Sequence, residues 1–192
     1  MILLAALAAG LLVGAVVARS QKRPWTLPQL RFLWLVVVAF LPQGLAFYLP
    51  ATRAHIPDAI AAAGLLISQT LLLVFCWLNR KVSGIWLLAL GTGLNLIVIA
   101  ANGGFMPISP QTAARLISAD ELAELQIGSR FGIKDILLVP GETHLAWLSD
   151  RFVSPGWLSR PVAFSLGDTG IAAGAFWLTA AQGKPLKSNQ GS

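Results

Sequence analysis

The stretch AIAAAGLLISQTLLLVFCWL, which runs from Ala59 to Leu78, decides the fold. It contains no charged side chain, and an α-helix needs about 20 predominantly apolar residues to cross the hydrocarbon core of a bilayer. Asn79, Arg80 and Lys81 follow directly, and basic residues of this kind collect at the ends of membrane spans. We therefore predict that residues 59–78 form a transmembrane helix.

Four further segments, on either side of this stretch in the sequence, are similarly apolar. Charged residues fall almost entirely between these segments, as expected if each segment crosses the membrane. The fold class predicted is an all-α polytopic membrane protein with five transmembrane helices. Its predicted spans, within a single membrane domain over residues 1–192, are about 2–18, 32–49, 59–78, 83–101 and 162–181.

The composition excludes other classes of protein. The chain has 192 residues, of which 56% are hydrophobic and 11% charged, with a mean hydropathy of +0.71. A soluble domain carries about 25% charged residues, and a disordered chain is still more polar. Cys76 is the only cysteine in the sequence, which excludes a disulfide scaffold.

The basic residues predict an orientation. The segments after the first, third and fifth spans carry eight Lys or Arg and no acid, whereas the two intervening segments carry six basic and seven acidic residues. Because Lys and Arg accumulate in cytoplasmic loops, we expect the amino terminus outside and the carboxyl terminus in the cytoplasm. The net charge of +6 then reflects topology anchors and contacts with membrane lipid, and it does not indicate a nucleic-acid partner.

The first span carries a ridge of small side chains. Ala6, Gly10, Gly14 and Ala18 recur every four residues, a pattern that lets membrane helices approach closely. Other membrane subunits are therefore candidate partners through this ridge. A cleaved signal peptide is the alternative for this segment, but no Lys or Arg precedes its apolar run, as a signal peptide requires.

The outer loop, residues 102–161, is expected to lie against the membrane surface with short interfacial helices. Serine and proline at helix starts, and a capping-box spacing, predict two of these helices. An apolar run that follows fits either a strand or chain packed on the bundle, and the next run has the pattern of an interfacial helix. These four segments are 110–117, 119–126, 136–139 and 144–152.

Two roles for this outer loop remain open. The loop is either a lid that covers the outer ends of the helices, or a recognition surface for a lipid headgroup, a periplasmic partner or another membrane subunit.

Asp168 is the one acidic residue within a predicted span. An acid there costs roughly 3 kcal/mol on insertion scales, so it must be protonated, paired or hydrated. Counting about 1.5 Å per residue from the outer helix ends places Asp168, Asn95 and Gln43 at similar depth, and we expect Asp168 to meet Asn95, Gln43 or both. The contact is either structural hydrogen bonding between helices or a polar pocket for a headgroup, a quinone or a proton.

The motif Asn102-Gly103-Gly104-Phe105-Met106-Pro107 ends the fourth span. Glycines after a helix adopt left-handed conformations that satisfy the terminal carbonyls, so the motif predicts a sharp turn. In the alternative reading, Asn102 and the backbone of the two glycines line the mouth of the polar pocket.

These residues carry a resemblance to a known family. The Asn102 to Pro107 motif, together with Ser165-Leu166-Gly167-Asp168 at the start of the last span, resembles a family of small bacterial integral-membrane proteins known as domain of unknown function 5317. The resemblance covers the chain from about Arg31 to Gln182. It implies a bacterial plasma membrane and no particular activity, and its motif residues are Asn102, Gly103, Gly104, Met106, Pro107, Gly167 and Asp168.

Catalytic signatures are otherwise poor. No His or Cys spacing resembles a metal site, and no Walker loop or dinucleotide fingerprint is present. We therefore expect no cofactor and no metal, and a non-enzymatic accessory or assembly subunit or a binder of a lipid-like ligand. The alternative is a small membrane enzyme or carrier in which Asp168 takes up and releases a proton.

Overall fold

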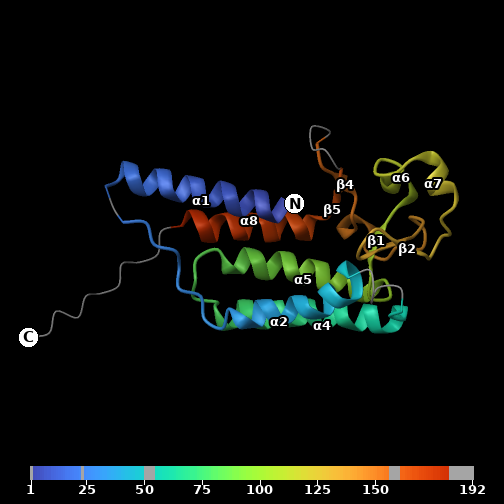
Figure 1. Ribbon diagram of the computed structural model, residues 1–192, viewed down its shortest axis with the longest axis horizontal. Helices are drawn as coiled ribbons and strands as arrows, with labels where there is room; N and C mark the ends of the chain where they lie inside the picture. Colours follow the sequence, from blue (N-terminus) through green and yellow to red (C-terminus); the bar gives the residue numbers. More distant parts are fainter. Residues whose placement is uncertain (1, 23, 50–54, 156–160, 182–192) are drawn as a thin grey trace, which may run out of the picture.

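The chain folds into a bundle of long helices with a small, partly β-stranded cap at one end (Figure 1). The computed structural model describes residues 2–22, 24–49, 55–155 and 161–181. The long segments are α1 (Ile2–Ser20), α2 (Trp34–Gln43) continued by η1 (Gly44–Tyr48), α4 (Asp58–Leu78), α5 (Ile85–Ala101) and α8 (Leu166–Ala180).

Two of these helices, α1 and α4, are long and apolar enough to cross a membrane on length and composition. The helix at 59–78 is therefore present almost as predicted. Five spans are not established, because α5 has 17 residues and α8 has 15, or about 26 and 22 Å at 1.5 Å per residue. Hydrocarbon about 30 Å thick calls for about 20 residues.

The second predicted span, 32–49, divides into two kinds of helix. Pro42 lies inside α2, and the chain continues directly as the π-helix η1. Proline removes a backbone donor and disturbs the preceding turn, and π-helical turns arise where the regular hydrogen-bond ladder is interrupted. Pro42 also contacts α4, since a Cβ at Gly64 would lie 3.3 Å from the Pro42 Cβ.

The small-residue ridge of α1 packs within the chain. Gly10, Gly14 and Ala18 are buried, and a Cβ at Gly10 would lie 2.5 Å from the Phe176 carbonyl oxygen of α8. A side chain at Gly14 would meet the Thr179 carbonyl oxygen at 2.7 Å. The buried part of the ridge therefore contacts α8 of the same chain.

The cap contains strands, which corrects the all-α expectation. β1 (Met106–Ile108) pairs in parallel with β3 (Asp135–Leu137), and β3 pairs antiparallel with β2 (Arg130–Phe131). A second pair joins β4 (Phe152–Val153) to β5 (Ala163–Phe164). Of the two alternatives for 136–139, the strand is therefore the one observed.

The predicted interfacial helices of the outer loop are shorter than expected. Both helix starts are correct, with Ser109 and Ser118 as N-caps, but the helices are only α6 (Pro110–Ala113) and α7 (Ala119–Ala123). The helix expected over 144–152 is wrong: a single 3₁₀ turn, η2 (Ala146–Leu148), is followed by β4. Leu145 has a φ of 54°, in the left-handed region that an α-helix does not use.

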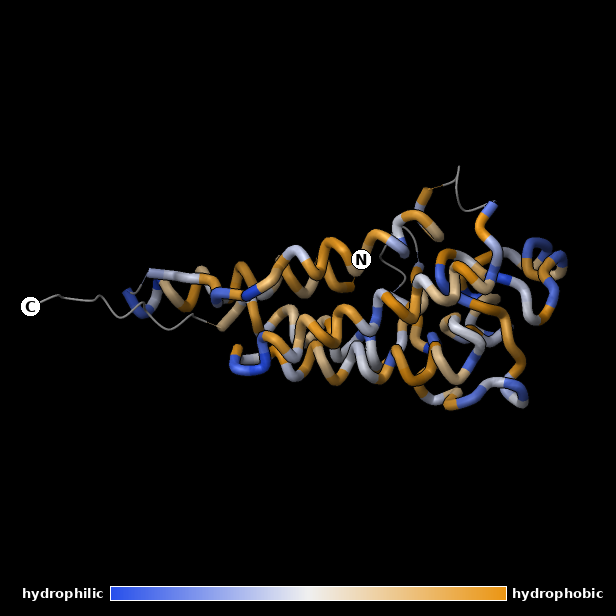
Figure 2. Tube along the Cα trace, turned by 90° about the horizontal axis from the view of Figure 1, so that it is seen from below, coloured by the Kyte–Doolittle hydropathy of each residue, from blue (hydrophilic) through white to orange (hydrophobic). Residues whose placement is uncertain are grey.

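The cap and the helices share one apolar core. Phe105, Met106 and Leu148 of the cap segment pack in the same buried cluster as Leu65 of α4 and Val98 of α5. Figure 2 shows apolar residues along the helices, with hydrophilic residues gathered at the end opposite the cap and over the cap itself. The outer loop is therefore packed against the bundle and is continuous with it.

The end opposite the cap is closed by an asparagine. Asn79, the C-cap of α4, is buried and donates from Nδ2 to the Phe75 carbonyl oxygen at 2.9 Å and to the Arg31 carbonyl oxygen at 3.0 Å. The Arg31 backbone N–H donates in return to Asn79 Oδ1 at 2.7 Å. One carboxamide therefore ties the chain before α2 to the end of α4.

Candidate functional site

Asn95 and Asp168, two of the candidate residues, meet between α5 and α8. Asn95 Nδ2 donates to Asp168 Oδ1 at 2.8 Å, and the Ser165 hydroxyl donates to Asn95 Oδ1 at 2.9 Å. The Ser165 Oγ also accepts from the Asp168 backbone N–H at 3.0 Å, while Asp168 Oδ2 accepts from the Ser165 N–H at 3.3 Å. We call Asn95, Ser165 and Asp168 the Asn95 network. Each of its side chains is bonded to the other two residues, so the network is closed.

The local sequence explains how Asp168 reaches this position. Ser165 is the N-cap of α8, and Asp168 is the third helical residue, so the two form a capping box. A carboxylate in the first turn is also favoured by the helix dipole. Asp168 therefore satisfies the start of its own helix while it contacts α5.

The expected depth of Asp168 is corrected by this geometry. The fifth span was predicted to begin at residue 162, which would place Asp168 well inside a helix. Instead Ala163 and Phe164 pair with β4, and the helix begins only at Leu166. Asp168 therefore lies in the first helical turn, beside the cap.

Glycines make this contact between α5 and α8 possible. A Cβ at Gly167 would overlap the Asn95 carboxamide, and one at Gly91 would lie 2.5 Å from the Ile171 backbone nitrogen. Gly170 and Gly174 make similar close contacts with α5. Such small-residue contacts let two helix backbones approach closely, and here they bring Asn95 within hydrogen-bonding reach of Asp168.

A charged cluster that the sequence reasoning did not identify lies in the cap. Lys134 Nζ donates to Asp150 Oδ2 at 2.7 Å and to Asp135 Oδ1 at 3.1 Å. The Asp150 side chain is 1% exposed, that of Asp135 14% and that of Lys134 29%. We call Lys134, Asp135 and Asp150 the Lys134 cluster.

The charges of the Lys134 cluster shift the pKa values of its members. Burial raises the pKa of Asp150 to about 7; Lys134 opposes this shift, and Asp135 and Asp168 add to it. Burial also raises the pKa of Asp135, against the opposing effect of Lys134. Burial lowers the pKa of Lys134, but the three carboxyl groups outweigh burial and raise it well above its usual value. Lys134 therefore stays charged while the carboxyl groups compete for a proton.

One atom of the Lys134 cluster stands out. Among the described residues, Asp150 Oδ1 is buried and accepts no hydrogen bond from a donor group, although buried carboxyl oxygens are normally paired. One lysine faces the carboxyl groups of Asp135 and Asp150, and carboxyl groups that share a site do not all ionise together. The cluster is therefore able to hold and exchange a proton. The one sequence signal for this cluster is the pair Lys134-Asp135 directly before an apolar run. The same pattern is equally typical of an exposed loop, so it does not indicate a buried cluster.

Gln43, another candidate, lies elsewhere in the bundle. It is buried in α2 and donates from Nε2 to the Ser68 hydroxyl of α4 at 2.5 Å. The structure therefore brings Asn95 and Asp168 together but does not bring Gln43 to them.

Asn102, the last candidate, ties the end of α5 to the cap. Its Nδ2 donates to the Val98 carbonyl oxygen at 2.8 Å and to the His144 carbonyl oxygen at 2.9 Å. Its Oδ1 accepts from the His144 backbone N–H at 2.9 Å. The carboxamide is thus engaged by backbone groups, in the same arrangement that Asn79 makes with Arg31.

The turn after Asn102 forms as the motif predicts. Gly103 and Gly104 have φ values of 72° and 89°, in the left-handed region, and the Gly104 N–H donates to the Ile99 carbonyl oxygen at 2.8 Å. A side chain at Gly104 would overlap Ala62 of α4. Met106 and Pro107 then enter β1, fully buried.

No metal site is apparent in the described part of the chain, where no three His, Cys, Asp or Glu side chains are grouped as ligands. Two surface cavities, one along α2 and η1 and one between α4 and α5, are not lined by any residue of the Asn95 network.

Comparison with known proteins identifies a family. Residues 28–180 match the model of a family described as Family of unknown function (DUF5317), and the chain belongs to that family. The chain matches no curated protein and no solved structure. The family resemblance noted from the Asn102 and Asp168 motifs is therefore confirmed, and it carries no activity with it.

Proposed function

We propose that this member of the family is a non-enzymatic polytopic protein of the bacterial plasma membrane that binds lipid-like ligands or serves as an accessory subunit in an assembly. The observation that carries the proposal is the large apolar surface that its helices expose. Trp34, Trp77, Trp86 and Trp177 are each more than half exposed, and Trp side chains are enriched at membrane interfaces. Large exposed apolar patches indicate contact with lipid or with another protein.

In the proposed topology all five long segments cross the membrane, with the amino terminus outside and the carboxyl terminus in the cytoplasm. The direction of the chain supports this arrangement, because α2, α4, α5 and α8 alternate in direction (Figure 1). The distribution of charge supports it as well. Arg31, Arg80 and Lys81 lie at the end opposite the cap, while Arg23, Lys184 and Lys187 are outside the described residues.

Cysteine labelling tests this topology. In a Cys76→Ser background, Gln111→Cys in α6 should react with a membrane-impermeant maleimide on intact cells, because the cap is proposed to face outward. Ser20→Cys, at the end of α1, should react only after permeabilisation. Both residues are exposed, so access depends on the membrane. Reaction of Ser20→Cys on intact cells would overturn the orientation, and extraction of the protein by alkaline carbonate would overturn the membrane location.

The closed Asn95 network supports the non-enzymatic part of the proposal. Its polar atoms join α5 and α8, so the hydrogen bonds of Asp168 have a structural use within the bundle. Asp168→Asn tests this role: the variant should accumulate in the membrane and complement a deletion strain. If it accumulates normally but fails to complement, a purely structural role of Asp168 is excluded.

A second candidate function rests on the Lys134 cluster. In this alternative the chain is a small enzyme or carrier, and Asp168 exchanges protons together with Asp150. The unpartnered Asp150 Oδ1 favours this alternative. Asp150→Asn distinguishes the two, since a carrier should lose its proton-dependent function whereas an accessory subunit should keep its function.

A further inference from the structure

A groove lies between α4 and α5 at the end opposite the cap. Its volume is about 440 Å³, and it is lined mainly by apolar side chains. Val74 and Trp77 of α4 and Trp86 and Ala89 of α5 form its walls, and Arg80 is its one charged lining residue. We call this cavity the Arg80 groove.

Arg80 is available to an anionic ligand. Its guanidinium lies 4.7 Å from the centre of the Trp77 ring, and it forms no ion pair with a carboxylate among the described residues. The neighbouring Lys81 adds a second exposed positive charge. The acid of α4 nearest in sequence, Asp58, lies at the opposite end of that helix, about 30 Å away at 1.5 Å per residue.

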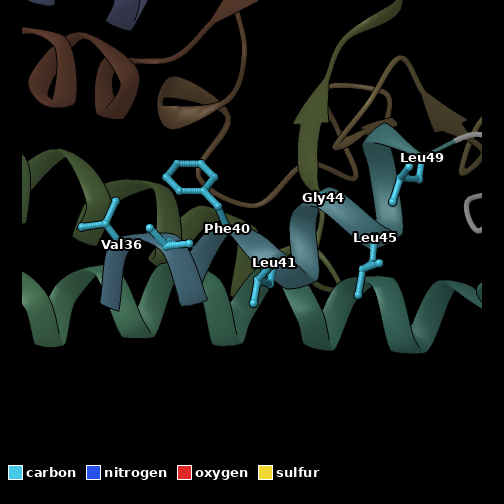
Figure 3. Close-up of a pocket in the computed structure, with 7 residues that line it drawn as sticks. Val36, Phe40, Leu41, Gly44, Leu45 and Leu49 are labelled. Carbon is cyan, nitrogen blue, oxygen red and sulfur yellow. The ribbon is translucent and has the colours of Figure 1, made fainter. Parts of the chain in front are cut away.

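A second groove provides a comparison within the same molecule. It has a similar volume of about 460 Å³ and lies along α2 and η1, where Val36, Phe40, Leu41 and Leu45 line it. Figure 3 shows that its labelled lining residues are all apolar or glycine. This α2 groove can accept an acyl chain, but it offers no charged side chain to a headgroup.

We propose that the Arg80 groove binds an anionic phospholipid, with one acyl chain between α4 and α5 and the phosphate on the Arg80 guanidinium. The fork of the guanidinium matches the oxygens of a phosphate. The exposed rings of Trp77 and Trp86 lie where an interface would place the glycerol region. The proposal rests on the proposed membrane location and adds a ligand class and a binding residue.

Native mass spectrometry of the full chain tests the proposal. The protein is extracted from mixed vesicles of phosphatidylglycerol and phosphatidylcholine. The number of molecules of each lipid that remain bound to one chain is then measured. The wild-type chain should retain phosphatidylglycerol preferentially. Arg80→Gln should reduce this preference about tenfold, because both the charge and the paired hydrogen bonds to phosphate are lost.

A matched variant separates a specific site from general surface charge. Arg19→Gln removes an exposed positive charge at the same end of the molecule, outside the groove. It should reduce the preference by about fivefold at most, the effect of one basic residue near an anionic surface. Equal losses in the two variants would overturn the proposal in favour of unspecific attraction.

The remaining outcomes are also decisive. Inorganic phosphate should not displace the retained phosphatidylglycerol, and displacement would show a phosphate site in place of a lipid site. If the wild-type chain inserts into vesicles but retains both lipids equally, the groove proposal fails while the membrane proposal stands. If the chain does not insert at all, the proposed membrane location fails first.

Discussion

The Asn95 network and the Lys134 cluster lie close enough to interact, yet they use polar groups in opposite ways. In the Asn95 network all three residues are bonded to one another, across the α5–α8 contact. In the Lys134 cluster one amine contacts two carboxyl groups, and the buried Asp150 Oδ1 has no hydrogen-bond donor among the described residues. A closed network fixes the distance between two helices. A cluster with more carboxyl groups than amines can gain or lose a proton while its side chains stay in contact.

The largest expected effect comes from the glycines that allow the Asn95 network to form. Gly91→Ala would place a Cβ in the backbone of α8, so the variant should lose about 3 kcal/mol of stability, the upper end of the usual cost of overpacking, or fail to fold. Thermal unfolding in detergent measures the change. Gly93→Ala is the control, because nothing lies within 4 Å of its Cβ position, and it should change stability by less than about 1 kcal/mol.

Asn95→Ala should have the next largest effect. It removes the partner of the Ser165 hydroxyl and of Asp168 Oδ1, and unpaired buried groups cost about 1–3 kcal/mol. Thr70→Val is the matched control, since the exposed Thr70 hydroxyl bonds only within its own helix, to the Leu66 carbonyl oxygen. Equal unfolding temperatures for the two variants would show that the network does not hold α5 and α8 together.

The Lys134 cluster should make stability depend on pH. Because the folded state raises the pKa of Asp150 from 3.8 to about 7, it binds a proton that the unfolded chain releases, and stability should fall as pH rises from about 4 to 7. Asp150→Asn should reduce this slope in thermal unfolding measured across that range. Glu142→Gln, at an exposed carboxyl of the same segment, should leave the slope unchanged. If the stability of Asp150→Asn fell with pH as steeply as that of the wild type, the pH dependence would belong to another group.

The smallest expected effect is a pH dependence of the opposite sign, in which stability falls as pH falls. The Ser118 backbone N–H and hydroxyl lower the pKa of Glu121 below 4.5, so its contribution to stability is present at neutral pH and is lost as pH falls. Glu121→Gln should therefore lower the unfolding temperature slightly at pH 7, less than Asn95→Ala does. The difference from wild type should shrink in strong acid, and a difference that grows there would contradict the assignment.

The sequence predicted the apolar helices and their caps, because apolar runs and capping signals are local. The count of depth along the helices named Asn95 as a partner of Asp168, but it also named Gln43, which bonds to Ser68 instead. The apolar pattern places Val162 to Phe164 at the start of the last helix, but three apolar residues fit a strand and a helix equally well. Their pairing with Phe152 and Val153 depends on a distant segment, and no local pattern reports it. The same limit hid the Lys134 cluster, in which Asp150 is buried only because the cap folds back onto β1.

The two asparagine ties impose an order on biosynthesis. When Asn79 is synthesised, its partner Arg31 already exists, 48 residues earlier, so the tie opposite the cap can close as α4 packs against α2. Asn102 must wait for His144, 42 residues later. At about 5–20 residues per second that wait lasts roughly 2–8 s. We therefore expect the Asn102 tie to close after the Asn79 tie as the chain is synthesised.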